Sequence, residues 1–89
     1  MYTIGRLAKQ FQLSRSTLLY YDSIGLLKPS SRTKGDYRQY SEDDAKRLEQ
    51  ICTYRRAGLG LKDIKNILDS LEHNLVPILE RRRITGRQQ

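Results

Sequence analysis

The chain has 89 residues, with 17 Lys and Arg against 10 Asp and Glu, and therefore a formal net charge of +7. A chain of this length forms one domain with a modest core, too small for both a sizeable ligand cavity and a separate binding surface. The excess of positive charge favours a polyanionic partner, either nucleic acid or an anionic membrane surface. The single Cys52 excludes an internal disulfide, and no apolar run approaches the roughly 18 residues of a membrane span. The first residues do not resemble a secretory leader, so we expect a cytoplasmic protein that is not bound to a membrane.

Two short helices are predicted at the start of the chain. Thr3 is a suitable N-cap for the first helix, whose apolar residues recur at i, i+3, i+4 and i+7. These apolar residues are Ile4, Leu7, Ala8 and Phe11. Ser14 is the expected N-cap of the second helix, which runs to about Ile24 and is closed by Gly25. Because so few residues separate them, the two helices must cross steeply, which is typical of a helix-turn-helix.

A basic β-hairpin is predicted next. Pro29 stops any helix, and Ser30–Arg32 and Tyr37–Tyr40 are expected to be short extended segments on either side of a turn. Within that turn, we expect Gly35 to supply the positive φ that tight turns often need. The exposed cations of the hairpin are expected to be Arg32, Lys34 and Arg38. A basic hairpin that directly follows a helix-turn-helix is typical of a wing.

A second pair of helices follows the hairpin. Ser41 is a suitable N-cap for the third helix, and the acidic residues behind it suit the positive end of the helix dipole. These acidic residues are Glu42, Asp43 and Asp44, and the buried stripe is expected to be Ala45, Leu48, Ile51 and Cys52. Gly58 ends this helix. Gly60 is the expected N-cap of the fourth, whose apolar residues are Leu61, Ile64, Ile67 and Leu68.

The end of the chain carries apolar residues and a run of arginines. Pro77 is tolerated only in the first turn of a helix, so a fifth helix is expected to start near residues 74–76. It has room for about three turns before Gly86, and an isolated helix of that length is marginal in water. Its apolar side must therefore rest on this domain or on a partner chain.

Several groups of residues stand in a characteristic order along the chain. They are Tyr2-Thr3-Ile4-Gly5 with Leu7-Ala8, Ser14 with Thr17-Leu18 and Tyr20-Tyr21-Asp22, Gly25-Leu26-Leu27 with Pro29, Arg32 with Tyr37-Arg38 and Tyr40, and Asp44, Arg47-Leu48, Ile51, Arg55, Gly58, Leu61 and Ile64. Together they resemble the N-terminal DNA-binding domain of the MerR family of bacterial transcription regulators. The resemblance covers roughly residues 2–68, and so many ordered positions are far more specific than any single short motif.

This resemblance implies a mostly α fold, a winged helix-turn-helix with a small β-hairpin wing, a second helix pair and the start of a dimerisation helix. It divides the chain into a DNA-binding domain over residues 1–70 and the start of a truncated dimerisation helix over residues 71–89, with Leu75, Ile78 and Leu79 as dimer contacts. It also implies a homodimer that distorts pseudo-palindromic, double-stranded promoter DNA and so acts indirectly on RNA polymerase. No effector-sensing segment is expected in this chain.

Three residues depart from the family's pattern. Leu19 stands where the family usually carries an Arg, so one cation that would face DNA is absent. Arg6 occupies the position of an acidic residue that would complete a capping box. Gln12 replaces the usual glycine of the turn, at a cost of about 1 kcal/mol if its backbone is left-handed.

Binding to DNA needs side chains that reach base edges and others that hold phosphates. On the second helix the candidates are Arg15, Ser16, Leu19, Tyr20 and Tyr21; on the wing they are Arg32, Lys34, Tyr37, Arg38 and Tyr40; and beyond the wing they are Arg55 and Lys62. Tyr20 and Tyr21 could instead be core aromatics, because a tyrosine has an apolar body and a polar tip, and Tyr40 could equally well pack in the core. Arg55 also suits the negative end of its helix.

The remaining chemistry points away from an enzyme. The sequence has no paired nucleophile and base and no Gly-rich phosphate loop, and Cys52 and His73 are too isolated to form a metal site. We expect no catalysis, cofactor or metal. An architectural or excisionase-like DNA-binding protein that acts in recombination is the main alternative. An RNA-binding module and a protein-only adaptor are weaker ones, the former because no aromatic sheet platform is visible.

Overall fold

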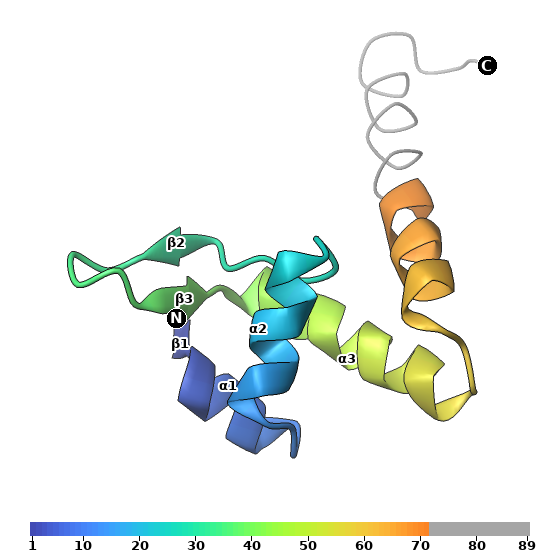
Figure 1. Cartoon of the computed structure of the whole chain (residues 1–89), viewed down its shortest axis with the longest axis horizontal. Coiled ribbons are helices and arrows are strands. Elements are labelled where there is room, and N and C mark those ends of the chain that lie inside the picture. Colours follow the sequence, from blue (N-terminus) through green and yellow to red (C-terminus); the bar gives the residue numbers. More distant parts are fainter. Residues whose placement is uncertain (72–89) are drawn as a thin grey trace, which may run out of the picture.

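The computed structural model describes residues 1–71, which form four helices and one three-stranded antiparallel sheet (Figure 1). The labelled elements are β1 (Tyr2–Thr3), α1 (Ile4–Gln10), α2 (Arg15–Ser23), β2 (Ser31–Arg32), β3 (Arg38–Tyr40) and α3 (Glu42–Arg56). Residues 61–71 form the fourth helix of this part, which has no label in the figure. The winged helix-turn-helix that the sequence predicts is confirmed. None of the helices within residues 1–71 has the length and apolar character of a membrane span.

The helix-turn-helix forms as its capping residues predict. The Thr3 hydroxyl accepts a hydrogen bond from the Arg6 amide at 3.1 Å, and the Ser14 hydroxyl accepts one from the Thr17 amide at the same distance. Each cap therefore satisfies one backbone donor in the first turn of its helix. In the turn between the helices, Gln12 has a φ of 59°, so its backbone is left-handed and the condition for a cost of about 1 kcal/mol is met. Gly25, directly after α2, has a φ of 75°.

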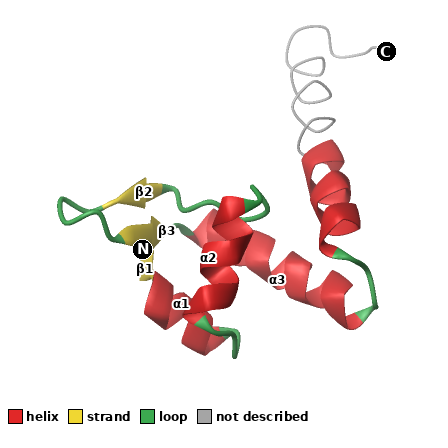
Figure 2. Cartoon of the chain, viewed as in Figure 1, coloured by secondary structure: helices red, strands yellow, loops and turns green. Residues whose placement is uncertain are grey.

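The sheet contains one strand that the sequence did not predict. The strand order is β1-β3-β2, with Tyr2 opposite Tyr40 on one side and Ser31 opposite Gln39 on the other. A strand of two residues is too short to show an alternating pattern, so β1 left no signal in the sequence. It places the start of the chain beside the base of the hairpin (Figure 2).

The hairpin turn corrects one expectation. Positive φ falls on Asp36, at 65°, and not on Gly35. The Asp36 amide donates to the Thr33 carbonyl, and the Thr33 amide donates to the Tyr37 carbonyl, both at 2.9 Å. This pattern is a three-residue connection with its left-handed residue in the last position. Aspartate tolerates that backbone better than most residues, so the glycine is not needed for it.

The second helix pair follows the predicted caps. Ser41 and Asp44 form a capping box at the start of α3, in which each side chain accepts a hydrogen bond from the other residue's amide. Gly58 has a φ of 96° just after α3, as expected of a residue that ends a helix. The Gly60 carbonyl accepts the first hydrogen bond of the last helix, from the Ile64 amide at 3.0 Å.

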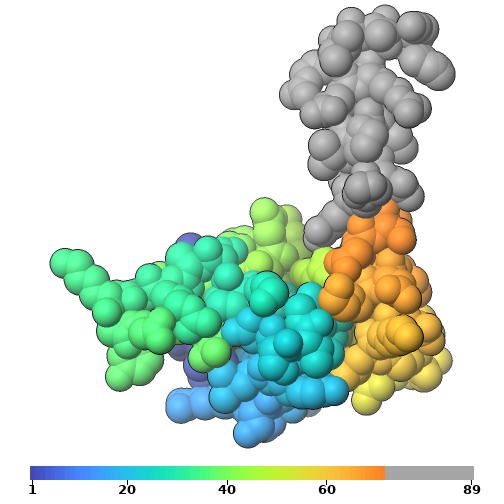
Figure 3. Space-filling view, turned by 45° about the horizontal axis from the view of Figure 1, so that its top comes forward, coloured from blue at the N-terminus to red at the C-terminus, as the bar shows by residue number. Residues whose placement is uncertain are grey.

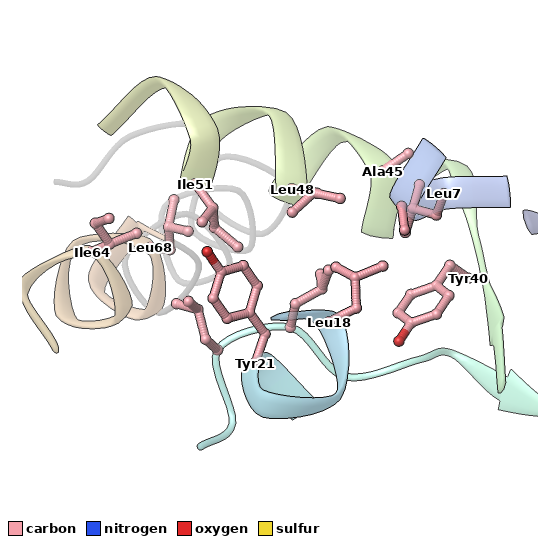
Figure 4. Close-up of a cluster of buried hydrophobic side chains, with 12 residues drawn as sticks. Leu7, Leu18, Tyr21, Tyr40, Ala45, Leu48, Ile51, Ile64 and Leu68 are labelled. Carbon is pink, nitrogen blue, oxygen red and sulfur yellow. The ribbon is translucent and has the colours of Figure 1, made fainter. Parts of the chain in front are cut away.

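The core lies where α1, α2, α3 and the last helix meet (Figure 4). It contains predicted apolar residues of α1, α3 and the last helix, whereas Ile4, Phe11 and Leu61 are only partly buried against it. Its buried members are Leu7, Ala8, Leu18, Tyr21, Leu26, Leu27, Tyr40, Ala45, Leu48, Ile51, Ile64 and Leu68. Cys52, predicted to be buried, is only partly so and packs against this cluster.

An arginine connects three parts of this core. The Arg47 guanidinium donates to the Leu26 carbonyl at 2.8 Å and to the Asp69 carboxylate at 3.0 Å. It therefore joins α3 to the segment after α2 and to the last helix. Lys65 pairs with the same Asp69 at 2.8 Å. The fifth helix expected near residues 74–76, and Leu75, Ile78 and Leu79 on it, lie outside the described residues.

Candidate nucleic-acid interface

The outer face of α2 carries four of the predicted contact residues. Leu18 and Tyr21 are buried on the inner side of the helix, so the residues on the opposite side of the helix project outwards. The outer face consists of Arg15, Ser16, Leu19 and Tyr20, all exposed. Leu19 and Tyr20 keep 42% and 54% of their surface in solvent, so both are accessible to a binding partner on this face.

The wing exposes cations and an aromatic ring. Arg32, Lys34 and Tyr37 are exposed, and Tyr37 keeps 73% of its surface in solvent. The Tyr37 amide donates to the Thr33 hydroxyl at 3.1 Å, which fixes the backbone where the ring projects. Figure 3 shows the hairpin, in green, extending from the body of the molecule beside the segment that contains α2.

A carboxylate near the end of α2 joins the two surfaces. Asp22 lies 2.9 Å from the Arg38 guanidinium and 3.7 Å from both Arg32 and Lys28. Its side chain is only 13% exposed, so these ion pairs are screened less than pairs on the open surface. Arg38, predicted to be an exposed DNA contact, is therefore half-buried and bound to Asp22. No local pattern predicts this pairing, because the two residues are 16 positions apart.

A second carboxylate fixes the base of the wing. Asp44 accepts hydrogen bonds from the Ser30 hydroxyl at 2.6 Å and from the Ser30 amide at 3.1 Å. The same carboxylate completes the capping box of α3. The residue just before β2 is thus held to the start of α3.

Two predicted contact residues are in the core instead. Tyr21 and Tyr40 are 6% and 0% exposed, which supports the packing alternative that the sequence left open for both. Tyr21 follows Leu18 by three positions and shares its buried face, and Tyr40 lies at the inner end of β3. Burial raises the pKa of each phenol above its ordinary value. The Tyr40 hydroxyl has no hydrogen-bond partner among residues 1–71. We therefore leave both residues out of the proposed interface.

Arg55 lies in the last turn of α3 and Lys62 in the first turn of the last helix, and these two elements meet on the other side of α2 from the wing (Figure 1). Both residues are exposed. Arg55 donates to the Leu59 carbonyl at 3.2 Å, so it also closes the end of α3, which was the alternative role.

The arrangement is a winged helix-turn-helix with cations on both sides of an exposed helix. A comparison with family models matches residues 2–71 to the MerR HTH family of regulatory proteins, so the chain belongs to the MerR family. The match covers every described helix and the wing.

Curated relatives agree with this assignment. The chain is 41% identical over 66 residues to the HTH-type transcriptional regulator ZntR homolog of Haemophilus influenzae, covering 74% of this chain and 49% of the relative. It is 37% identical over 83 residues to the HTH-type transcriptional regulator SkgA of Caulobacter vibrioides, covering 93% of this chain and 32% of the relative. The chain thus spans about half the length of the first relative and a third of the second.

Solved structures resemble the described fold. The N-terminal part of Mta, the multidrug transporter activator of Bacillus subtilis, superposes with a TM-score of 0.76 at 32% identity, covering 93% of this chain and 86% of that one. HiNmlR, a MerR family regulator lacking the sensor domain, was solved bound to promoter DNA. It superposes with a TM-score of 0.69 at 28% identity, covering 89% of this chain and 68% of that one.

Proposed function

We propose that this chain is the duplex-DNA-binding head of a MerR-type transcription regulator. The observation that carries the proposal is the junction at Asp22, which holds the basic wing beside the exposed face of α2. A protruding helix fits the major groove, and a basic hairpin next to it reaches the neighbouring backbone. The net charge of +7 supplies the electrostatic attraction that such binding needs.

Within this proposal the contact residues have different roles. On α2, Arg15 reaches base edges or phosphate, Ser16 and Tyr20 donate to phosphate, and Leu19 meets a thymine methyl group. On the wing, Arg32, Lys34, Tyr37 and Arg38 contact phosphates or the minor groove, with Arg38 shared between DNA and Asp22. Arg55 and Lys62 hold phosphates at the other end of the site, Lys62 close to the amides that begin the last helix.

We further propose that two copies act together on a pseudo-palindromic promoter site and distort it, so that RNA polymerase responds indirectly. Support comes from the relatives, which are named as transcription regulators, and from HiNmlR, which was solved on promoter DNA. Dimerisation through Leu75, Ile78 and Leu79 belongs to this proposal. An excisionase-like role is disfavoured because the family match extends over the second helix pair.

The test is a fluorescence-anisotropy titration. Genomic fragments that bind the protein would first be selected, and the best site would then be compared as a duplex and as its separate strands. We expect the duplex to bind more tightly, with log affinity falling against log salt by about 0.9 for each phosphate neutralised. Equal or tighter binding to single strands would refute the proposal.

A further inference from the structure

Two glycines lie directly under side chains of the proposed interface. The first is Gly5, in the first turn of α1, and the second is Gly35, in the turn of the wing. Neither has a positive φ, so the backbone at these positions does not demand glycine. What each position lacks is room for a side chain.

At Gly5 the space is taken by Arg15. A Cβ at this position would lie 2.8 Å from Nη2 of Arg15, 3.1 Å from Nε and 3.2 Å from Cζ. Non-bonded atoms in contact are about 3.5–4.0 Å apart, so the guanidinium already occupies the space that a side chain at Gly5 would need. The contact crosses the helix-turn-helix, because Arg15 is the first residue of α2 and Gly5 belongs to α1.

At Gly35 the space is taken by Tyr37. A Cβ there would lie 3.0 Å from Cε2 and 3.1 Å from Cδ2 of the ring. The exposed ring therefore rests on the turn instead of pointing freely into solvent. This contact also explains why a glycine stands in the turn although the left-handed residue is Asp36.

We propose that Gly5 and Gly35 are positioning residues, which hold the Arg15 guanidinium and the Tyr37 ring in place before DNA arrives. The proposal rests on the proposed function. Ordering a long side chain on binding opposes association, so a side chain that already lies against the scaffold binds with a smaller loss of entropy. Any residue larger than glycine would displace it. Because the displaced atoms are the far ends of side chains, the fold itself would remain intact.

The experiment is a double-mutant cycle on Gly5 and Arg15, with affinity for the selected duplex measured by anisotropy. Arg15→Ala should weaken binding by about 5- to 150-fold, the range for an arginine that contacts DNA. Gly5→Ala should weaken it by about 2- to 12-fold, the factor that corresponds to immobilising one long side chain. In the Arg15→Ala background, Gly5→Ala should have no further effect.

Folding and side-chain order are measured on the same variants without DNA. Alanine is a better helix former than glycine, so Gly5→Ala should melt no lower than wild type. NMR relaxation of the Arg15 Nε–H group should show a restricted guanidinium in the wild type and a more mobile one in Gly5→Ala. Gln10→Ala is the control, because Gln10 is an exposed residue of the same helix outside the proposed interface and binding should not change.

The same cycle applies to the wing. Gly35→Ala should weaken duplex binding, Tyr37→Ala should weaken it at least as much, and the combined variant should match Tyr37→Ala alone. Because the wing and α1 are separate elements, this cycle is an independent test of whether a glycine positions a neighbouring interface side chain.

Several results would overturn the proposal. They are wild-type affinity in Gly5→Ala, an undiminished effect of Gly5→Ala in the Arg15→Ala background, a lowered melting temperature, or an unchanged Arg15 relaxation. If the wild type binds duplex DNA and Gly5→Ala binds equally well, the positioning proposal alone fails. If the wild type binds no duplex, the proposed function fails and the positioning proposal falls with it.

Discussion

The outer face of α2 and the wing lie side by side, but they are held in place by different forces. The helix is anchored by Leu18 and Tyr21, which are buried in the core. In the wing, none of residues 31–39 is buried, and its position depends on short strand ladders and on the carboxylates of Asp22 and Asp44. Moderate salt leaves the stabilisation from apolar burial almost unchanged, whereas it screens and so weakens ion pairs. We therefore expect the helix to be the fixed part of the interface and the wing the adjustable one.

The largest expected effect comes from the anchor of the helix. Leu18→Ala should lower the free energy of unfolding by about 2–5 kcal/mol, because it removes a fully buried side chain and leaves a cavity. DNA binding should be lost together with the fold. Urea unfolding monitored by circular dichroism measures this change. Leu19→Ala is the matched control, and its stability should stay within about 0.5 kcal/mol of wild type. Equal losses in the two variants would contradict the assignment of inner and outer faces.

Asp22, which anchors the wing, should contribute less to stability than Leu18 does. It should have a larger effect on the salt dependence of duplex binding. Asp22→Asn should lower stability by about 1–3 kcal/mol, because the half-buried Arg38 loses its charged partner. The same change leaves Arg32 and Arg38 freer to bind phosphate, which steepens the salt dependence of duplex binding by up to about one unit for each cation. Thermal melts and a salt titration measure the two effects.

Asp36→Asn is the control for the wing. Asp36 pairs with the same Arg32 at 3.5 Å, but its side chain is 82% exposed, and asparagine also tolerates a left-handed backbone. We expect no change in melting temperature. If Asp36→Asn and Asp22→Asn behave alike, the buried junction is not what holds the wing.

Two adjacent tyrosines separate binding from folding on a smaller scale. Tyr20→Phe should weaken duplex binding by about 0.5–1.5 kcal/mol, the net value of one hydrogen bond, and leave stability unchanged. Tyr21→Phe should leave duplex affinity unchanged, because the ring of Tyr21 is buried in the core. Anisotropy and thermal melts on both variants decide the matter. A binding defect in Tyr21→Phe as large as in Tyr20→Phe would return Tyr21 to the interface.

The sequence predicted the helical part of this molecule well because the signals are local. Ser14 and Ser41 cap the helices that they were expected to cap, and the i, i+3, i+4 spacing identified Leu7 and Ala8 as core residues. The left-handed backbone at Gln12, which was raised from the sequence only as a condition, lies at the position where the family usually has glycine. Each of these features depends on residues that are close together in the chain.

The features that the sequence did not reveal depend on contacts between distant residues. Pairing of Asp22 with Arg38 and contact of Gly5 with Arg15 arise only when separate elements come together. For Tyr40, an apolar body with a polar tip fits both core and surface. Only the packing of β3 against the helices determines that this side chain is buried. The prediction of a positive φ at Gly35 was wrong, because glycine usually indicates that conformation. Here the missing side chain of Gly35 leaves room for the ring of Tyr37.

The smallest expected effect lies where the last helix meets α3. Apolar burial and ion pairs again act together there. The last helix is held by the buried Ile64 and Leu68, and also by the ion pairs of Asp69. Hydrogen bonds from the Lys65 ammonium, and then from the Arg47 guanidinium, hold the pKa of Asp69 below its ordinary value. The lowered pKa means that the native state favours the charged carboxylate. Its contribution to stability is therefore present above the unfolded pKa of about 3.9 and is lost as the pH falls through the lower, folded value.

Asp69→Asn should accordingly reduce stability at neutral pH, and the difference from wild type should close as the pH falls below about 4. Because the Asp69 side chain is 47% exposed, solvent screens these pairs and the loss should not exceed about 1 kcal/mol. Urea unfolding between pH 3 and pH 7 gives the measurement, with molar salt as the control that should shrink the difference at neutral pH. A gap that persists unchanged at low pH and in high salt would mean that Asp69 acts through neutral hydrogen bonds. In that case the apolar contacts and the Arg47 bond to the Leu26 carbonyl would be what fixes the last helix.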